Sequence, residues 1–340
     1  FLVEILDVTS QQKELTPQLR YLQSRSPGQI SMAVGSDEQS TFADPYGGFL
    51  IPEGFTPGLL SVANEMDPLA PLCNMVPMQS PTVAFNARTD KTHTSSVSGG
   101  LRVYRRAESD EVSSSRMEME QVKLTATSLF GLAYATEELL ARSPMSFAAL
   151  LEAGFRDEFA ATLLNEKLNG TGVGQFEGVN NSPALVTVSK ESGQAADTIV
   201  EANILKMRAR CWGYNNAVWL ANHDTIPQLA QLQGGDSANI WHPSMSPDIP
   251  TMLMGRPIFF SEFPETVGDA GDILCLNMSQ YLVGTLTPLS SASSIHVRFV
   301  NHEQTFKFWM ENDGRGWWRA ALTPKKGSTL SPFVRLAARA

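Results

Sequence analysis

The sequence predicts a mixed α+β fold. Three observations support this: one long amphipathic helix over residues 146–168, an alternation of short strands and short helices between residues 184 and 289, and two period-two strand patterns between residues 295 and 311. With 340 residues, the chain is long enough for two moderate domains or one large one.

The first 41 residues are mostly polar and are interrupted by Pro17 and Pro27. Three leucines in this segment have nothing within it to pack on: Leu15, Leu19 and Leu22. This pattern indicates either a mobile terminus or a segment that packs on another molecule, and we favour the second interpretation.

Short elements are expected next. Residues 44–52 carry paired glycines before an apolar run that ends at Pro52, which indicates a turn leading into a strand. Residues 55–64 fit a short helix, and residues 75–85 fit an extended segment in which Val83 and Phe85 alternate with polar or small residues.

Residues 88–116 have no core pattern of their own and are rich in Ser and Thr. Such a stretch is too long for an ordinary loop in a compact domain, so it is either disordered or needs a partner. Its flanks look like strands, which together predict a long two-stranded projection. The apolar phase shifts by one between Met119 and Val122, which predicts a β-bulge.

The charges of this stretch are segregated into a basic group and an acidic group. They lie on a solvated face or pair with opposite charges on adjacent subunits, and we favour pairing because repeated copies offer complementary surfaces at high effective concentration. The candidate contact residues are Arg102, Arg105, Arg106, Glu108, Asp110 and Glu111.

The long helix follows. Pro144 suits its start, and Asn169-Gly170 suits its end. At about 1.5 Å per residue it is roughly 33 Å long. Apolar residues at four-residue steps define its packing side: Phe147, Leu151, Phe155, Phe159 and Leu163.

The remaining chain alternates short elements. Residues 217–222 read as a buried strand followed by a helix that Asp224 caps, and residues 243–250 form a proline-rich loop. Two alternating strands then follow, at residues 295–299 and 306–311.

Composition and motifs argue against several functions. A net charge of −9 disfavours tight, sequence-independent nucleic-acid binding, and no apolar run is long enough for a membrane span. The three cysteines are far apart, so neither a disulfide framework nor a zinc site is expected. His302-Glu303 opens like a zinc-protease motif, but Phe306 stands where the second His is needed. We therefore predict no catalytic, cofactor or metal site.

Several sequence features resemble the Hong Kong 97-like major capsid proteins of tailed bacteriophages. The long helix ends in Leu-Asn-Gly-Thr-Gly at residues 168–172 and runs into Phe-Glu-Gly-Val at residues 176–179. Gly-Gly-x-Leu-x-Pro occurs at residues 47–52, and Leu-x-Gly-x-Pro at residues 253–257. The order of these weak motifs carries the resemblance, which covers the chain from about residue 44 to residue 336.

The resemblance implies a division of the chain. An N-terminal arm takes residues 1–55, and an extended β-hairpin called the E-loop takes residues 87–122. The peripheral domain takes residues 56–86 and 123–183, with the long helix as its spine, and the strands of residues 290–325. An axial A-domain takes residues 184–289, to which residues 326–340 return.

The resemblance also implies a function, which is assembly and not catalysis. Copies are expected to form pentamers and hexamers of an icosahedral virion shell that encloses double-stranded DNA without sequence-specific binding, assembled in the host bacterial cytoplasm. Expected partners are a portal protein at one vertex and, in some relatives, scaffolding, a maturation protease and decoration proteins. An encapsulin-like compartment and a hydrolase of unrecognised chemistry are the alternatives. Some relatives crosslink through an E-loop lysine; Lys91 is the only lysine in the expected loop, and we assign no crosslink.

Overall fold

A computed structural model describes residues 67–88, 91–142, 147–232, 241–242 and 251–339. These residues belong to the second of two units, residues 61–340; the first unit is residues 1–60. The expected N-terminal arm, the turn at residues 44–52, the helix at residues 55–64 and the proline-rich loop lie outside the described residues.

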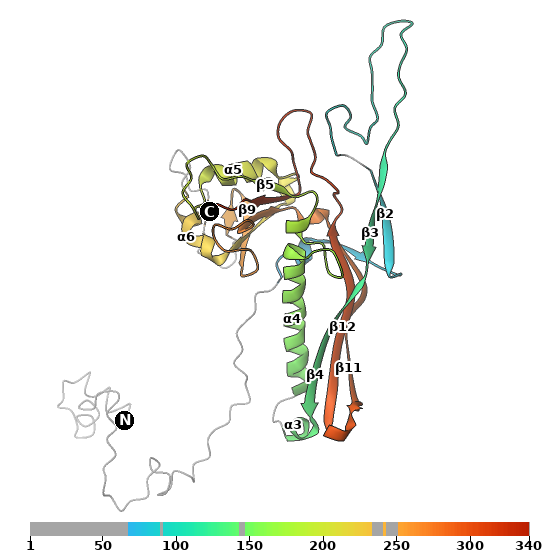
Figure 1. The fold of residues 1–340 in the computed structure, drawn as a ribbon, viewed down its shortest axis with the longest axis vertical. Helices are drawn as coiled ribbons and strands as arrows, with labels where there is room; N and C mark the ends of the chain where they lie inside the picture. The colour runs from blue at the N-terminus through green and yellow to red at the C-terminus, as the bar shows by residue number, and fades with distance from the viewer. Residues whose placement is uncertain (1–66, 89–90, 143–146, 233–240, 243–250, 340) are drawn as a thin grey trace, which may run out of the picture. The chain divides into compact units, whose positions relative to one another are not determined.

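A four-stranded sheet has the order β1-β11-β12-β4 (Figure 1). Its strands are β1 (Asn74–Pro77), β4 (Thr127–Thr136), β11 (Tyr281–Arg298) and β12 (Glu303–Gly316). β4, β12 and β11 are antiparallel neighbours, while β1 adds to β11 in parallel over residues 282–285 only. β11 is one continuous strand, so it crosses the boundary expected between residues 289 and 290.

The long helix, α4 (Phe147–Asn169), lies beside this sheet (Figure 1). The short helix α3 (Glu137–Arg142) precedes it. Side chains of α4 pack on residues of β12 and β4 in a core with Phe159, Phe306, Phe308 and Ala135 at its centre. Because successive side chains of β4 and β12 point to opposite faces of the sheet, only one face takes part in this core.

A seven-stranded sheet has the order β5-β13-β10-β6-β9-β8-β7. Its strands are β5 (Val186–Val188), β6 (Val218–Asn222), β7 (Trp241–His242), β8 (Met252–Leu253), β9 (Arg256–Ser261), β10 (Ile273–Leu276) and β13 (Phe333–Leu336). β13, the last strand in the sequence, lies between β5 and β10, one strand in from an edge of this sheet.

The seven-stranded sheet is buried on both faces. One face packs against α5 (Glu201–Arg210) and α6 (Ile226–Ala230), with Trp219 and Cys275 turned toward these helices. The other face packs against the C-terminal end of α4, where Leu164 and Leu168 meet Leu220. Helix α4 therefore supplies side chains to two separate cores.

The third sheet is the hairpin of β2 (Thr82–Arg88) and β3 (Met119–Thr125). Its register is continuous from the pair Thr82 and Thr125 to the pair Arg88 and Met119. The bulge expected between Met119 and Val122 is therefore wrong. Met119 lies on the outer face of the hairpin and is 66% exposed, so its apolar character does not mark a buried position.

Candidate assembly surfaces

The loop between β2 and β3 is attached to the rest of the chain at its base. Thr92 bridges in parallel to Thr323, the His93 N–H donates to the Thr323 carbonyl at 2.7 Å, and the Thr323 N–H donates to the Lys91 carbonyl at 2.9 Å. Lys91 Nζ also lies 3.3 Å from Glu120 Oε2 on β3. These contacts fix the start of the loop against the segment that follows β12.

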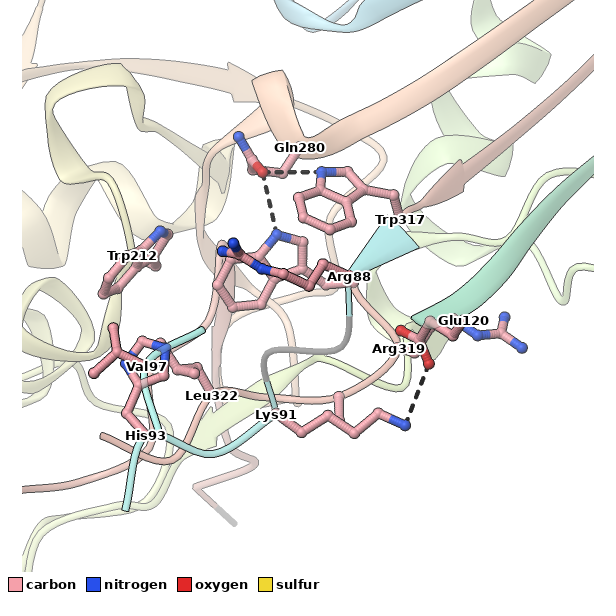
Figure 2. Close-up of a pocket in the computed structure, with 12 residues that line it drawn as sticks. Arg88, Lys91, His93, Val97, Glu120, Trp212, Gln280, Trp317, Arg319 and Leu322 are labelled. Carbon is pink, nitrogen blue, oxygen red and sulfur yellow. Dashed lines mark hydrogen bonds and ion pairs between the residues drawn. The ribbon is translucent and has the colours of Figure 1, made fainter. Parts of the chain in front are cut away.

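An aromatic cluster lies beside this base (Figure 2). The indole N–H groups of Trp317 and Trp318 both donate to Gln280 Oε1, at 2.9 and 3.1 Å. The Trp212 ring lies 6.1 Å from the Trp318 ring. The residues surround a hollow of about 380 Å³, whose lining includes His93, Val97, Leu322 and the three tryptophans. The aromatic cluster and the loop base thus line the same hollow.

The distal part of the loop, residues 101–118, is exposed at every position. Its interactions are local: the Arg102 N–H donates to Ser115 Oγ at 3.0 Å, and Arg106 Nη1 donates to the Asp110 carbonyl at 3.0 Å. A hydrogen bond from Ser113 and then one from Arg102 lower the pKa of Tyr104. No core of its own holds this part of the chain.

The structure places all six candidate contact residues in this exposed part. Among the described residues, none of the six forms an ion pair. Apolar side chains stand beside them, with Val103 97% exposed and Val112 49% exposed. A chain segment that presents unpaired charges and apolar groups to solvent is typical of a surface that another molecule covers. These side chains are available to a partner: Arg102, Arg105, Arg106, Glu108, Asp110 and Glu111.

The helix residues expected to pack lie in internal cores. Phe159 is buried in the core between α4 and the four-stranded sheet, and Phe147, Leu151 and Phe155 border it. The Phe155 ring stacks on the Phe308 ring of β12, with 4.5 Å between centroids. Leu163 borders the core of the seven-stranded sheet instead. These residues stabilise the subunit from within, and together they do not form a surface that a second molecule could contact.

A third surface was missed by sequence reasoning. It is the face of the four-stranded sheet opposite α4, where Phe130, Leu132 and Tyr134 are 60%, 53% and 42% exposed. The sequence does indicate this surface. A strand with one buried face needs an apolar residue only at every second position, but residues 129–135 are apolar at odd and even positions alike.

Two further kinds of functional feature, a cluster of metal-ligating side chains and a membrane-spanning helix, are absent from the described part of the chain. No three His, Cys, Asp or Glu side chains come together there in an arrangement that could hold a metal ion. No helix in the same ranges is long and apolar enough to span a bilayer. The most deeply buried charge pairs among the described residues, Lys167 with Asp67 and Arg339 with Asp272, join separate segments of the subunit.

The solved structures that resemble this one include capsid proteins. The capsid of an empty GTA particle, computed with C5 symmetry, is 16% identical with a TM-score of 0.68, covering 88% of this chain and 99% of that chain. The protein of Mycobacterium phage Bobi is 14% identical with a TM-score of 0.62, covering 88% and 98%. That of the mature capsid of bacteriophage PhiM1 is 11% identical with a TM-score of 0.53, covering 84% and 91%. Among curated proteins, none matches the sequence.

The fold of the described residues is therefore that of a capsid subunit. The chain belongs to the phage capsid family, since the model of that family matches residues 47–324. It is a major capsid protein that forms the shell, and its role is structural. The expectation of a Hong Kong 97-like phage capsid protein is confirmed at this level.

Proposed function

We propose that this chain builds an icosahedral shell from pentamers and hexamers and that the shell encloses the double-stranded DNA of a tailed phage. The observation that carries the proposal is the exposed loop of residues 101–118, whose charged side chains form no ion pair within the described chain and whose apolar side chains Val103 and Val112 are open to solvent. Identical copies supply that partner at high effective concentration.

We assign the parts of the subunit as follows. Residues 87–122 form the E-loop, and the four-stranded sheet with α4 forms the peripheral domain. The seven-stranded sheet forms the axial A-domain, to which β13 returns. Because β11 pairs with β12 from Tyr281 onward, residues 281–289 go with the peripheral domain rather than the A-domain. Residues 1–55 form an arm along neighbouring subunits.

Several interfaces of ordinary size are enough to hold such a shell. An interface that buries about 800 Å² per partner contributes roughly 20 kcal/mol gross if most of that area is apolar, before the costs of association reduce it heavily. Each subunit has several neighbours in a closed shell, so the small net gains accumulate without covalent links.

The contents and partners follow from the same proposal. A net charge of −9 allows the shell to hold DNA without sequence-specific binding. A portal protein occupies one vertex, and scaffolding, a maturation protease and decoration proteins are further candidate partners. Assembly takes place in the host bacterial cytoplasm, and the mature shell is part of the virion.

Shortening the loop tests the role of the E-loop. The Arg102 N–H and Ser115 Oγ are 3.0 Å apart, so residues 103–114 can be replaced by a short Gly-Ser turn without disturbing β2, β3 or the base. We expect a folded, soluble subunit that forms no regular particles in negative-stain microscopy and sedimentation. A circular dichroism spectrum like that of the parent controls for folding, and normal shells from the shortened variant would refute the assignment.

Two alternatives are separated by simple measurements. An encapsulin-like compartment has protein cargo, so nuclease-protected DNA in purified particles favours the phage capsid and enzyme cargo favours the compartment. A hydrolase of this size sediments as a small oligomer, whereas a capsid protein sediments as pentamers, hexamers or very large particles.

A further inference from the structure

A second hollow, of about 580 Å³, lies where the end of β5, the helix α5 and the loop of residues 324–330 meet. These three segments are far apart in the sequence, and backbone and side-chain hydrogen bonds hold them together. The Ser331 N–H donates to the Arg210 carbonyl at 3.0 Å, and Arg210 Nη1 donates to Thr329 Oγ1 at 2.9 Å. β5 is fixed in turn by its parallel pairing with β13. The fold itself therefore sets the walls of this hollow.

Helix α5 presents an apolar side to the sheet and a basic side to the hollow. Ile204 and Met207 are fully buried in the core that includes residues of β5 and β13. Lys206 and Arg210 are four residues apart, so they lie on one face of the helix, and both line the hollow. Packing of the apolar side thus fixes the direction in which the two basic side chains project.

The hollow is basic although the chain as a whole is acidic. Its twelve lining residues include four basic side chains and no carboxylate, whereas the chain has 35 acidic and 26 basic residues. The four are Lys190, Lys206, Arg210 and Lys326. Like charges held around one space repel one another, so an anion placed between them relieves the repulsion.

The chain neutralises only part of this charge. Lys206 Nζ lies 2.6 Å from Glu191 Oε1, and both side chains of this pair are partly exposed. Arg210 uses Nη1 on Thr329, which is a neutral partner. Among the described residues, neither Arg210 nor Lys326 forms an ion pair. At least two positive charges therefore line the hollow without a carboxylate of the subunit beside them.

The donors around the hollow suit the oxygen atoms of phosphate groups. Arginine and lysine are the side chains that bind phosphate, and Ser189 and Ser328 add hydroxyl groups that can donate to it. The volume lies within the range of about 300–1,000 Å³ that is usual for small-ligand sites. A DNA duplex presents its phosphates on a convex surface, so a concave hollow fits a small anion better than it fits a duplex.

We propose that this hollow binds a small oligophosphate anion, with Lys206 and Arg210 of α5 on one side and Lys326 of the loop on the other. The proposal goes beyond assembly, because it gives each subunit a ligand site of its own. The bound anion neutralises the basic side chains and links the loop of residues 324–330 to α5.

Isothermal titration calorimetry of the full-length chain with sodium triphosphate tests the site. We expect one site per subunit with a dissociation constant of about 100 μM or lower. Lys190→Gln with Lys326→Gln is expected to weaken binding by about tenfold or more. Lys123→Gln with Lys307→Gln removes the same charge at exposed positions outside the hollow and is the matched control, for which an unchanged dissociation constant is expected. No binding to the parent chain, or an equal loss in both variants, would overturn the proposal. Binding of a DNA duplex without binding of triphosphate would overturn it as well.

Lysine labelling locates the ligand without any substitution. The chain is acetylated with acetic anhydride in the presence and absence of triphosphate, and each lysine is followed by mass spectrometry. At a triphosphate concentration of about ten times the dissociation constant, acetylation of Lys206 and Lys326 is expected to slow by about tenfold, because only about one site in eleven is then empty. Lys123 is expected to react at an unchanged rate. Unchanged labelling of Lys326, or equal protection of Lys123, would show that triphosphate does not occupy this hollow.

Discussion

Two glycines, one packed against helix α4 and one within it, are expected to change the stability of the subunit in opposite directions when each is replaced by alanine. Gly131 lies on β4 under the aromatic rings of α4, and Gly154 lies on α4 itself and is exposed. The perturbation is Gly131→Ala in one variant and Gly154→Ala in the other.

The structure sets the sign and size of each effect. A Cβ at Gly131 would lie 2.5 Å from Phe155 Cε1 and 3.3 Å from Phe159 Cε2. Since the Phe155 ring is stacked on Phe308, it has little freedom to move, and overpacking of this kind costs about 1–3 kcal/mol. A Cβ at Gly154 has no atom within 4 Å, and alanine in a helix interior is favoured over glycine by about 0.5–1 kcal/mol.

Urea unfolding followed by circular dichroism measures both effects. The loop-shortened subunit is the suitable background, because unfolding is then not coupled to dissociation of particles. We expect Gly131→Ala to lower the free energy of unfolding and Gly154→Ala to raise it. A Gly131→Ala subunit as stable as the parent would refute the packing of α4 on β4, and a destabilised Gly154→Ala subunit would refute the exposed position of Gly154.

Two further predictions concern buried charges and thiols. Arg339 and Asp272 are both fully buried, and burial raises the pKa of Asp272 while Arg339 opposes that rise. Arg339→Met alone leaves an unpaired buried carboxylate and is expected to lower the free energy of unfolding by about 3–5 kcal/mol. The double variant Asp272→Asn with Arg339→Met is expected to recover most of that loss. Equal instability of the single and double variants in urea would argue against the pair. Burial raises the pKa of the Cys73 thiol to about 11, and the nearby Lys167 opposes this rise. The protonated thiol therefore contributes fully to the free energy of unfolding below about pH 9, and this contribution is lost as the pH rises through 11. Cys73→Ala is expected to remove about 2 kcal/mol of the loss of stability between pH 8 and pH 11, and an unchanged pH dependence would contradict this.

The elements with a single dominant period could be predicted from the sequence. The long helix was expected over residues 146–168 and spans Phe147–Asn169, because one apolar side along its length is enough to define it. Strand β6 (Val218–Asn222) was expected over residues 217–222, since five consecutive buried residues leave a continuous apolar run.

Other parts depend on contacts that no local pattern encodes. β4 has apolar residues on both of its faces: one face packs against α4 and the other is exposed. The alternation of apolar and polar residues that marks a strand is therefore absent from its sequence. The parallel pairing of β1 with β11 joins residue 74 to residue 282, and nothing near either strand specifies the other. Met119 suggests a bulge that is absent, because apolar character at an outer position of a hairpin resembles a shift in register. In each case the missing information is what a distant segment, or a second molecule, covers.

The position of α4 in two cores has a mechanical consequence. Phe159 anchors the helix to the four-stranded sheet, and Leu168 anchors the next turns to the seven-stranded sheet. Any rotation of one sheet against the other must bend the helix or draw one of these side chains out of its pocket. Helix α4 therefore couples the two sheets mechanically. A force that displaces one sheet is transmitted through the helix to the other sheet.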